Sequence, residues 1–152
     1  MHTFEVFAEW TGDSNSVGTL RSPSGLHCQF AVPTDFGGPG GCPSPEELLL
    51  AALASCYGIT IAYMAELKRL PLLKQTLRVQ GIVERDPQTR RLRFTRFNLA
   101  LHFTVSVAAT EAQVESILKL AKDAKSYCLV SNSLSEQIQF EVHSEWSRET
   151  PL

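Results

Sequence analysis

The first third of the chain alternates apolar and polar residues with the two-residue period of a β-strand. Three stretches show this pattern: "TFEVFAEWTG" (3–12), "VGTLRS" (17–22) and "LHCQFAV" (26–32). The segments between them, "GDSNS" and "PSG", are made of turn-forming residues. The pattern therefore predicts three antiparallel strands.

A long helix is predicted to follow the Gly- and Pro-rich loop "PTDFGGPGGCPSP" (33–45). Ser44 has the position of an N-cap, Pro45 the first helical position, and Glu47 the third residue after the cap, which together form a capping box. Pro71, after "ELKRL", is expected to close the helix.

This helix carries no charge over the 17 residues from Leu48 to Met64, which raises the question of a membrane span. A spanning helix needs about 20 predominantly apolar residues, and this run is shorter and includes Ser55, Gly58 and Thr60. We expect no membrane and a helix that is buried on nearly every side. Such a helix needs more cover than a small domain offers, which indicates a partner subunit.

The second half of the chain predicts a hairpin, a helix and a closing strand. Residues 74–86 and 91–107 alternate around the polar turn "DPQTR", and 110–127 has apolar residues at helical spacing with Thr110 as its cap. "CLVSNSLS" is consistent with one or two further helical turns, and "QIQFEVHSEW" with a strand. The order βββ-α-ββ-α-(α)-β predicts an α+β fold in a single domain over 1–152.

Composition and charge narrow the class of protein. The chain has 152 residues, of which 43% are hydrophobic and 20% charged, as in a compact domain with its own core. A net charge of −2 with dispersed basic residues argues against nucleic acid as a partner. The first ten residues lack the layout of a secretory signal, so we expect a cytoplasmic protein.

Four cysteines, Cys28, Cys42, Cys56 and Cys128, are far apart and form no CxxC pair, so neither a zinc site nor a disulfide framework is indicated. The four histidines show no ligand spacing, and we expect no metal and no cofactor. Cys28 fits a packing residue of its strand. Cys42, in the Gly/Pro loop, is either an oxidisable thiol or an incidental one.

Two separated motifs carry a resemblance to a known family. "PEELLLAALASC" ends in Cys56, and "AKSYCLVSNSL" places Cys128 72 residues later. Together with the element order, these motifs resemble the OsmC/Ohr family, the osmotically inducible protein C and organic hydroperoxide resistance proteins. Glu46 matches the first acid of the family's first motif, and Lys125, Cys128 and Ser131 match its second motif.

The resemblance implies an OsmC-like fold, an intertwined homodimer with the long helix buried at its centre, and thiol peroxidase chemistry. Cys56 would attack an organic hydroperoxide and become a sulfenic acid, and Cys128 would resolve it as a disulfide. A dithiol of the lipoyl type would then reduce the protein, and Glu46 would organise the site. Without the resemblance, Cys56 at a buried apolar position would be read as an ordinary core residue.

A reactive Cys56 needs donors or positive charge, because a free thiol with a pKa near 8.5 is mostly protonated at neutral pH. In the family an arginine paired with the acid that matches Glu46 supplies this charge. Glu46 and Cys56 are ten residues apart, about 15 Å along one helix, so a shared site would take Glu46 from the partner subunit. This is a hypothesis that monomeric, well-separated chains would contradict.

The sequence departs from the family where the arginine is expected. The two positions that hold it in Ohr-type and OsmC-type proteins correspond here to Ser16 and to Asp35. Arg21 is either a substitute or a solvated strand residue. Leu129 also replaces the family's proline after the second cysteine, although a helix beginning there would still favour a reactive Cys128, with Lys125 nearby. The alternative function is therefore a small-molecule-binding or redox-sensing dimer on the same scaffold.

Overall fold

The computed structural model describes residues 1–151, and residue contacts divide the chain into two compact units, Met1–Leu49 and the chain from Leu50 onward. The first unit contains the predicted meander. Strands β1 (Phe7–Glu9), β2 (Gly18–Arg21) and β3 (His27–Phe30) pair antiparallel in that order. They are confirmed but shorter than the alternating pattern, and a short 3-10 helix, η1 (Thr34–Phe36), follows them.

Aromatic contacts organise this small sheet. The rings of Trp10 and Phe30 lie 5.2 Å apart, and they enclose Gly18, where an added Cβ would lie 2.5 Å from the Phe30 ring. Arg21 lies opposite Phe7 in the β1–β2 register, with its guanidinium 5.3 Å from the centre of that ring. The cation of Arg21 is therefore engaged on an aromatic ring of its own sheet.

Helix α1 (Pro45–Leu67) begins with the predicted capping box. The Ser44 amide donates to Glu47 Oε2 (2.8 Å), and the Glu47 amide donates to the Ser44 hydroxyl (3.2 Å). At the other end, Leu70 N–H donates to the carbonyl of Ala65, and Arg69 adopts the left-handed conformation with φ 51°. Arg69 thus ends the helix before the predicted stop at Pro71 is reached.

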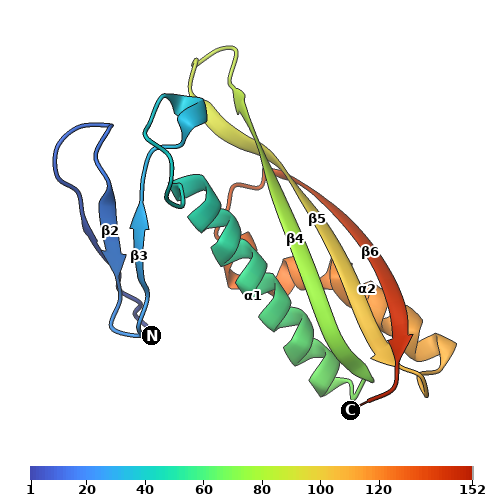
Figure 1. The fold of residues 1–152 in the computed structure, drawn as a ribbon. Coiled ribbons are helices and arrows are strands. Elements are labelled where there is room, and N and C mark those ends of the chain that lie inside the picture. Colours follow the sequence, from blue (N-terminus) through green and yellow to red (C-terminus); the bar gives the residue numbers. More distant parts are fainter. Residues whose placement is uncertain (152) are drawn as a thin grey trace. The chain divides into compact units, whose positions relative to one another are not determined.

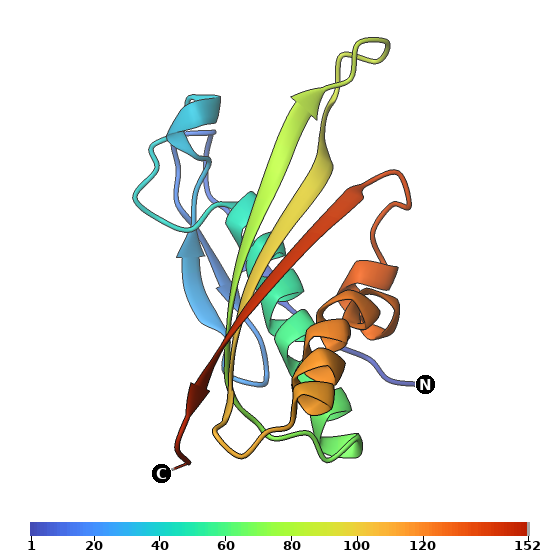
Figure 2. The same cartoon turned by 90° about the vertical axis from the view of Figure 1, so that its right-hand side faces the viewer.

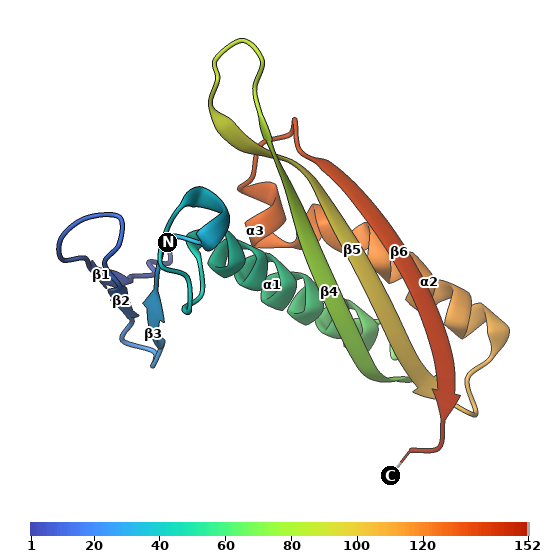
Figure 3. The same cartoon turned by 45° about the horizontal axis from the view of Figure 1, so that its top comes forward.

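The second unit is a three-stranded sheet with helices packed on one face (Figures 1 and 2). Strands β4 (Leu72–Arg85) and β5 (Leu92–Ser106) form the predicted hairpin, and β6 (Gln139–Glu149) lies parallel to β5 on its other side. Helices α2 (Glu111–Tyr127) and α3 (Leu129–Asn132) connect β5 to β6, and Figure 3 shows α3 directly after α2. This arrangement confirms the α+β fold.

The core of the second unit lies between the sheet and the helices. From β5 it takes alternate residues, which are Phe97, Leu99, Leu101, Phe103 and Val105. From α2 it takes residues at helical spacing, which are Val114, Ile117, Leu120, Ala121 and Ala124. From α1 it takes a single stripe of every fourth residue, Leu53, Tyr57, Ile61 and Ala65.

Several large apolar side chains on the other faces of α1 are exposed in the described residues 1–151. Ile59 is 71% exposed, Tyr63 60% and Leu67 65%. By length and composition alone α1 could cross a membrane, because an 18-residue window has a mean hydropathy of 1.8. Within the structure, 22% of this window is buried. Its buried stripe, however, packs as the core helix of a folded domain. The expectation of a helix covered on nearly every side is thus not met by one chain.

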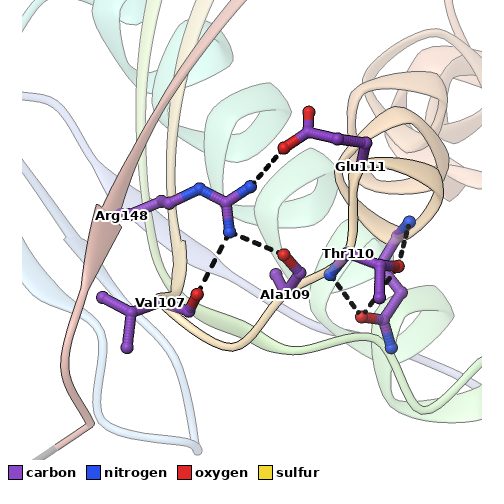
Figure 4. Close-up of polar contacts among 6 residues, drawn as sticks. Val107, Ala109, Thr110, Glu111 and Arg148 are labelled. Atoms are coloured by element: carbon purple, nitrogen blue, oxygen red, sulfur yellow. Dashed lines mark hydrogen bonds and ion pairs between the residues drawn. The ribbon is translucent and has the colours of Figure 1, made fainter.

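Arg148 fixes the connection between β5 and α2 (Figure 4). Its guanidinium donates to the carbonyls of Val107 (3.3 Å) and Ala109 (2.6 Å), and it pairs with Glu111. Next to it, the Thr110 hydroxyl accepts from the amide of Gln113 (3.3 Å), and the Gln113 side chain accepts from the Thr110 amide (2.9 Å). Thr110 is therefore the predicted cap, and a second capping box starts α2.

Candidate active site

Cys128 occupies the junction of two helices. It is both the C-cap of α2 and the N-cap of α3, and its backbone is extended (φ −73°, ψ 117°). Its side chain is fully buried, and its sulfur accepts a hydrogen bond from the amide of Ser131 (3.4 Å). The Ser131 hydroxyl lies within hydrogen-bonding distance of two carbonyls, those of Lys125 (2.5 Å) and Cys128 (3.1 Å). Ser131 thus stabilises the bend between α2 and α3 at which Cys128 lies.

Cys56 lies half-buried on α1, and the fold brings its sulfur to Cys128, with which it shares a side-chain hydrogen bond. The backbone N–H groups of Val130 and Leu129, in the first turn of α3, also donate to Cys56. Two thiols that are 72 residues apart in sequence therefore form one site. Both are reduced in the structure, as are Cys28 and Cys42, which are half-buried in the first unit.

The two thiols differ in acidity. Burial raises the pKa of Cys56, but the hydrogen bonds from Cys128, Val130, Leu129 and Thr60 outweigh it, and the net shift of the Cys56 pKa is downward. Burial raises the pKa of Cys128, and its hydrogen bond to Cys56 raises that pKa further. Ionisation of the pair therefore places the negative charge on Cys56 and leaves the proton on Cys128.

Tyr57 holds α1 against α2 next to the thiols. Its hydroxyl donates to the carbonyl of Ala121 at 2.6 Å, and its ring is fully buried. Burial, together with the charge of a nearby Cys128 thiolate, raises the pKa of Tyr57 to about 12. The phenol thus stays protonated and keeps donating at neutral pH, which fixes the helix that carries Cys56.

The donors that lower the pKa of Cys56 are uncharged. The ammonium of Lys125 lies 4.8 Å from the centre of the Phe140 ring. Arg21 lies over Phe7. The groups that lower the pKa of Cys56 are the Cys128 thiol, the N–H groups of Val130 and Leu129, and the Thr60 hydroxyl.

A cavity of about 710 Å³ lies between α1 and α2. Apolar and aromatic side chains make most of its wall, and Thr60, one turn after Cys56, belongs to it. The full lining consists of Ile59, Thr60, Tyr63, Met64, Leu67, Lys68, Asp123, Ser126 and Tyr127. A cavity of this size suits a small organic molecule.

Glu46 stands apart from the two thiols. It lies in the first turn of α1, ten residues before Cys56 in a continuous helix, and about 15 Å away along the helix axis. Its Oε2 atom is buried and has no hydrogen-bond partner within residues 1–151, whereas its neighbour Glu47 serves the capping box. The structure thus joins two of the three predicted site residues and leaves the third with an unpaired carboxylate oxygen.

Sequence reasoning missed Thr60 and Tyr57. Thr60 follows Cys56 by four residues, so its hydroxyl could have been expected beside the thiol on the same helix face. Tyr57 gave no such signal, because its partner is a backbone carbonyl 64 residues away. Within residues 1–151, no group of three or more His, Cys, Asp or Glu side chains could hold a metal ion.

Comparisons with known proteins agree with this fold. The sequence profile described as OsmC-like protein matches residues 38–143. The protein named "Uncharacterized protein YmaD" of Bacillus subtilis (strain 168) is 31% identical over 146 residues, covering 94% of this chain and 93% of that protein.

Solved structures share the fold at lower identity. An OsmC-like protein of unknown function from Vibrio cholerae aligns with a TM-score of 0.80 at 17% identity, over 97% of this chain and 100% of that one. An organic hydroperoxide resistance protein OsmC from Legionella pneumophila aligns with a TM-score of 0.72 at 22% identity, over 97% and 99% of the two chains. At these identities the likeness is one of fold.

Proposed function

The chain belongs to the OsmC-like protein family, and we propose that within it the chain is a thiol peroxidase that reduces organic hydroperoxides through Cys56 and Cys128. The observation that carries this proposal is the meeting of the two thiols with opposite pKa shifts. A peroxidatic cysteine attacks as a thiolate, and a neighbouring thiol resolves the sulfenic acid that forms. The lowered pKa of Cys56 suits it to the first role, and Cys128 is the neighbouring thiol.

The reaction consumes one hydroperoxide and produces one disulfide. The Cys56 thiolate attacks the terminal oxygen of the hydroperoxide, the O–O bond breaks, and the alkoxide leaves as an alcohol after taking a proton. Cys56 is then a sulfenic acid. Cys128 then gives up its proton and its sulfur attacks the Cys56 sulfur, so that an S–S bond forms, the S–O bond breaks, and the hydroxyl leaves with that proton as water. A dithiol of the lipoyl type accepts the oxidation by thiol–disulfide exchange and restores both thiols.

The cavity beside Thr60 supports an organic rather than an inorganic peroxide. Its wall is largely apolar and its volume of about 710 Å³ is far larger than hydrogen peroxide requires. Burial of the organic group supplies binding energy at about 25 cal/mol per Å² of apolar surface. The Legionella pneumophila neighbour, named an organic hydroperoxide resistance protein, is consistent with this substrate class.

A homodimer is part of the proposal. The uncovered apolar faces of α1 and the unpaired Glu46 carboxylate oxygen are both features that a second copy of the chain would complete. Glu46 would then reach the thiol site of the partner rather than its own.

Steady-state turnover tests this function. Purified protein is supplied with cumene hydroperoxide or hydrogen peroxide and with dihydrolipoamide or glutathione, and peroxide loss is followed. We expect turnover with the organic peroxide and the dithiol, and a much lower kcat/KM with hydrogen peroxide. Cys56→Ser should abolish turnover. Full activity of Cys56→Ser, or no turnover by the wild type under any combination, would contradict the proposal.

One observation favours the second candidate, a small-molecule-binding or redox-sensing dimer. The family's arginine is replaced by Ser16 and Asp35, and the donors to Cys56 are uncharged. In that case, the cavity would bind a ligand that changes the oxidation rate of the thiol pair without turnover. Wild-type protein that forms the disulfide only as fast as free cysteine, but binds an apolar probe tightly, would support this candidate over the enzyme.

A further inference from the structure

The Thr60 hydroxyl has two acceptors and one hydrogen. Thr60 lies one helical turn after Cys56, and its hydroxyl donates to the Cys56 carbonyl at 2.8 Å. The two side chains are four residues apart and lie on the same helix face, and the hydroxyl is one of the groups whose hydrogen bonding lowers the pKa of the Cys56 thiol. A hydroxyl rotates freely but can donate to only one acceptor at a time. The acceptor that it serves therefore depends on the relative strength of the two bonds.

A bond from a threonine hydroxyl to the carbonyl four residues earlier is ordinary in helices and by itself indicates no function. Ser55 makes a similar bond on the same helix, to the carbonyl of Ala52 at 3.1 Å, on an exposed face. Thr60 differs in two respects. Its hydroxyl lies beside a sulfur, and its side chain belongs to the wall of the cavity between α1 and α2.

The charge of the sulfur decides the competition. A neutral thiol is a weak acceptor, so the carbonyl holds the hydroxyl while Cys56 is protonated. A thiolate is an ionised acceptor, and hydrogen bonds to ionised groups are roughly twice as strong as neutral ones. When Cys56 ionises, the Thr60 hydroxyl forms a stronger hydrogen bond by turning to the sulfur. The Cys56 carbonyl still accepts the backbone N–H of the residue four positions later in the helix.

We infer that the Thr60 hydroxyl is a catalytic donor that turns from the Cys56 carbonyl to the Cys56 sulfur when the thiol ionises, and so holds the thiolate toward the cavity. Its catalytic meaning rests on the proposed peroxidase function, but its effect on ionisation does not. Thr60, Cys128 and the first turn of α3 would together stabilise the Cys56 thiolate. In the family that the sequence resembles, an arginine has this role. The titratable groups near it are Cys128 beside the sulfur and Tyr63, Lys68, Asp123 and Tyr127 in the cavity wall.

The test measures ionisation of Cys56 without a peroxide. Fully reduced full-length protein is alkylated with iodoacetamide between pH 5 and 10, and modification of the Cys56 peptide is followed by mass spectrometry. Thr60→Val keeps the shape and removes the hydroxyl. We expect alkylation of Cys56 at pH 7 to slow by roughly three- to tenfold and its pH midpoint to rise. Thr60→Ser, which keeps the hydroxyl, should restore wild-type behaviour.

Ser55→Ala is the matched control, because it removes a hydroxyl from the same helix that does not face the sulfur. Urea unfolding of each variant verifies that the fold is intact. Equal pH midpoints for Thr60→Val and wild type would overturn the inference, even if both reduce hydroperoxides. A shifted midpoint in a protein without peroxidase turnover would support the inference and refute the proposed function, so the two failures are distinguishable.

Discussion

Hydrogen bonds from neutral groups, rather than ion pairs, govern the chemistry of individual residues in this site. The downward shift of the Cys56 pKa comes from a thiol and two backbone N–H groups that overcome burial. The bonds of Ser131 position the donor Cys128. The bond from Tyr57 to the carbonyl of Ala121 positions α1, which carries Cys56. The acidity of one thiol thus depends on the junction of three helices.

Titration of Tyr57 is expected to lower the stability of the protein at alkaline pH. Its pKa is about 12 when folded against a reference of 10.0. Below pH 10 the phenol is protonated in both states and its contribution is complete. Between pH 10 and 12 only the unfolded chain loses the proton, so this contribution declines as the pH rises. Urea unfolding at several pH values should show a shallower alkaline decline in Tyr57→Phe than in wild type.

The same variant should lose roughly 1 kcal/mol at pH 7, because the carbonyl of Ala121 loses one donor in the buried interface of α1 and α2. Tyr127→Phe is the control, since Tyr127 is 68% exposed and should change neither quantity. Identical alkaline profiles for Tyr57→Phe and wild type would show that the phenol does not limit stability.

At the scale of elements, side-chain bonds to backbone groups decide where helices start. Ser44 and Glu47 cap α1, and Thr110 and Gln113 cap α2. Arg148 adds a bond from β6 to the loop that precedes α2, where its side chain is 29% exposed. Because α2 leads directly to Cys128, the position of the resolving thiol depends on this remote arginine.

Arg148→Met should destabilise the protein by about 1–2 kcal/mol, since two carbonyls lose a charged donor and Glu111 loses its partner. Urea unfolding measures the change. Arg96→Met is the comparison, because Arg96 pairs with Glu141 at 3.4 Å with side chains 42% and 46% exposed. A pair of this kind contributes within about 0.5 kcal/mol. Equal losses in the two variants would argue against a structural role for the Arg148 contacts.

Local features of the fold could be predicted from the sequence, and long-range ones could not. Both helix starts and the β4–β5 hairpin follow from neighbouring residues, and all three are confirmed. The parallel pairing of β6 with β5 has no local signal, because about thirty residues of helix and loop separate the strands. The end of α1 could not be predicted to the residue, because it is formed by a non-glycine residue, Arg69, in a left-handed conformation.

The same distinction applies to the site. Cys56 and Cys128 were identified through motifs, and Glu46 through its place in the first motif. The identity of the donors to Cys56 depends on how α3 meets α1, which no periodicity contains. The ammonium of Lys125 lies over the Phe140 ring, and its proximity to Cys128 stays a prediction. The roles of all three site residues stay predictions.

At the scale of the whole molecule, the apolar faces of α1 predict self-association. Replacing Ile59 and Tyr63 by Glu would place two charges in a buried interface, which is strongly unfavourable without partners. Light scattering should give about twice the chain mass of 16.8 kDa for wild type and a value near 16.8 kDa for the double variant. Leu92→Glu, at a 47% exposed position at the start of β5, should remain dimeric.

A wild-type protein of single-chain mass at micromolar concentration would contradict the homodimer. It would also leave Glu46 without a route to a thiol site, since its own Cys56 is ten residues away on the same helix. Cooperative unfolding of the two compact units in one transition would support the predicted single domain over 1–152.

The most direct test of the central claim is the mass of the protein after one equivalent of organic hydroperoxide. Reduced protein is mixed anaerobically with cumene hydroperoxide, quenched in acid at successive times, and digested under conditions that preserve disulfides. We predict a Cys56–Cys128 linked peptide with the loss of two hydrogen atoms, and a Cys56 sulfenic acid trapped in Cys128→Ser. If the linked peptide formed no faster than the disulfide of free cysteine, or joined Cys28 or Cys42 instead, the two-thiol mechanism would be contradicted.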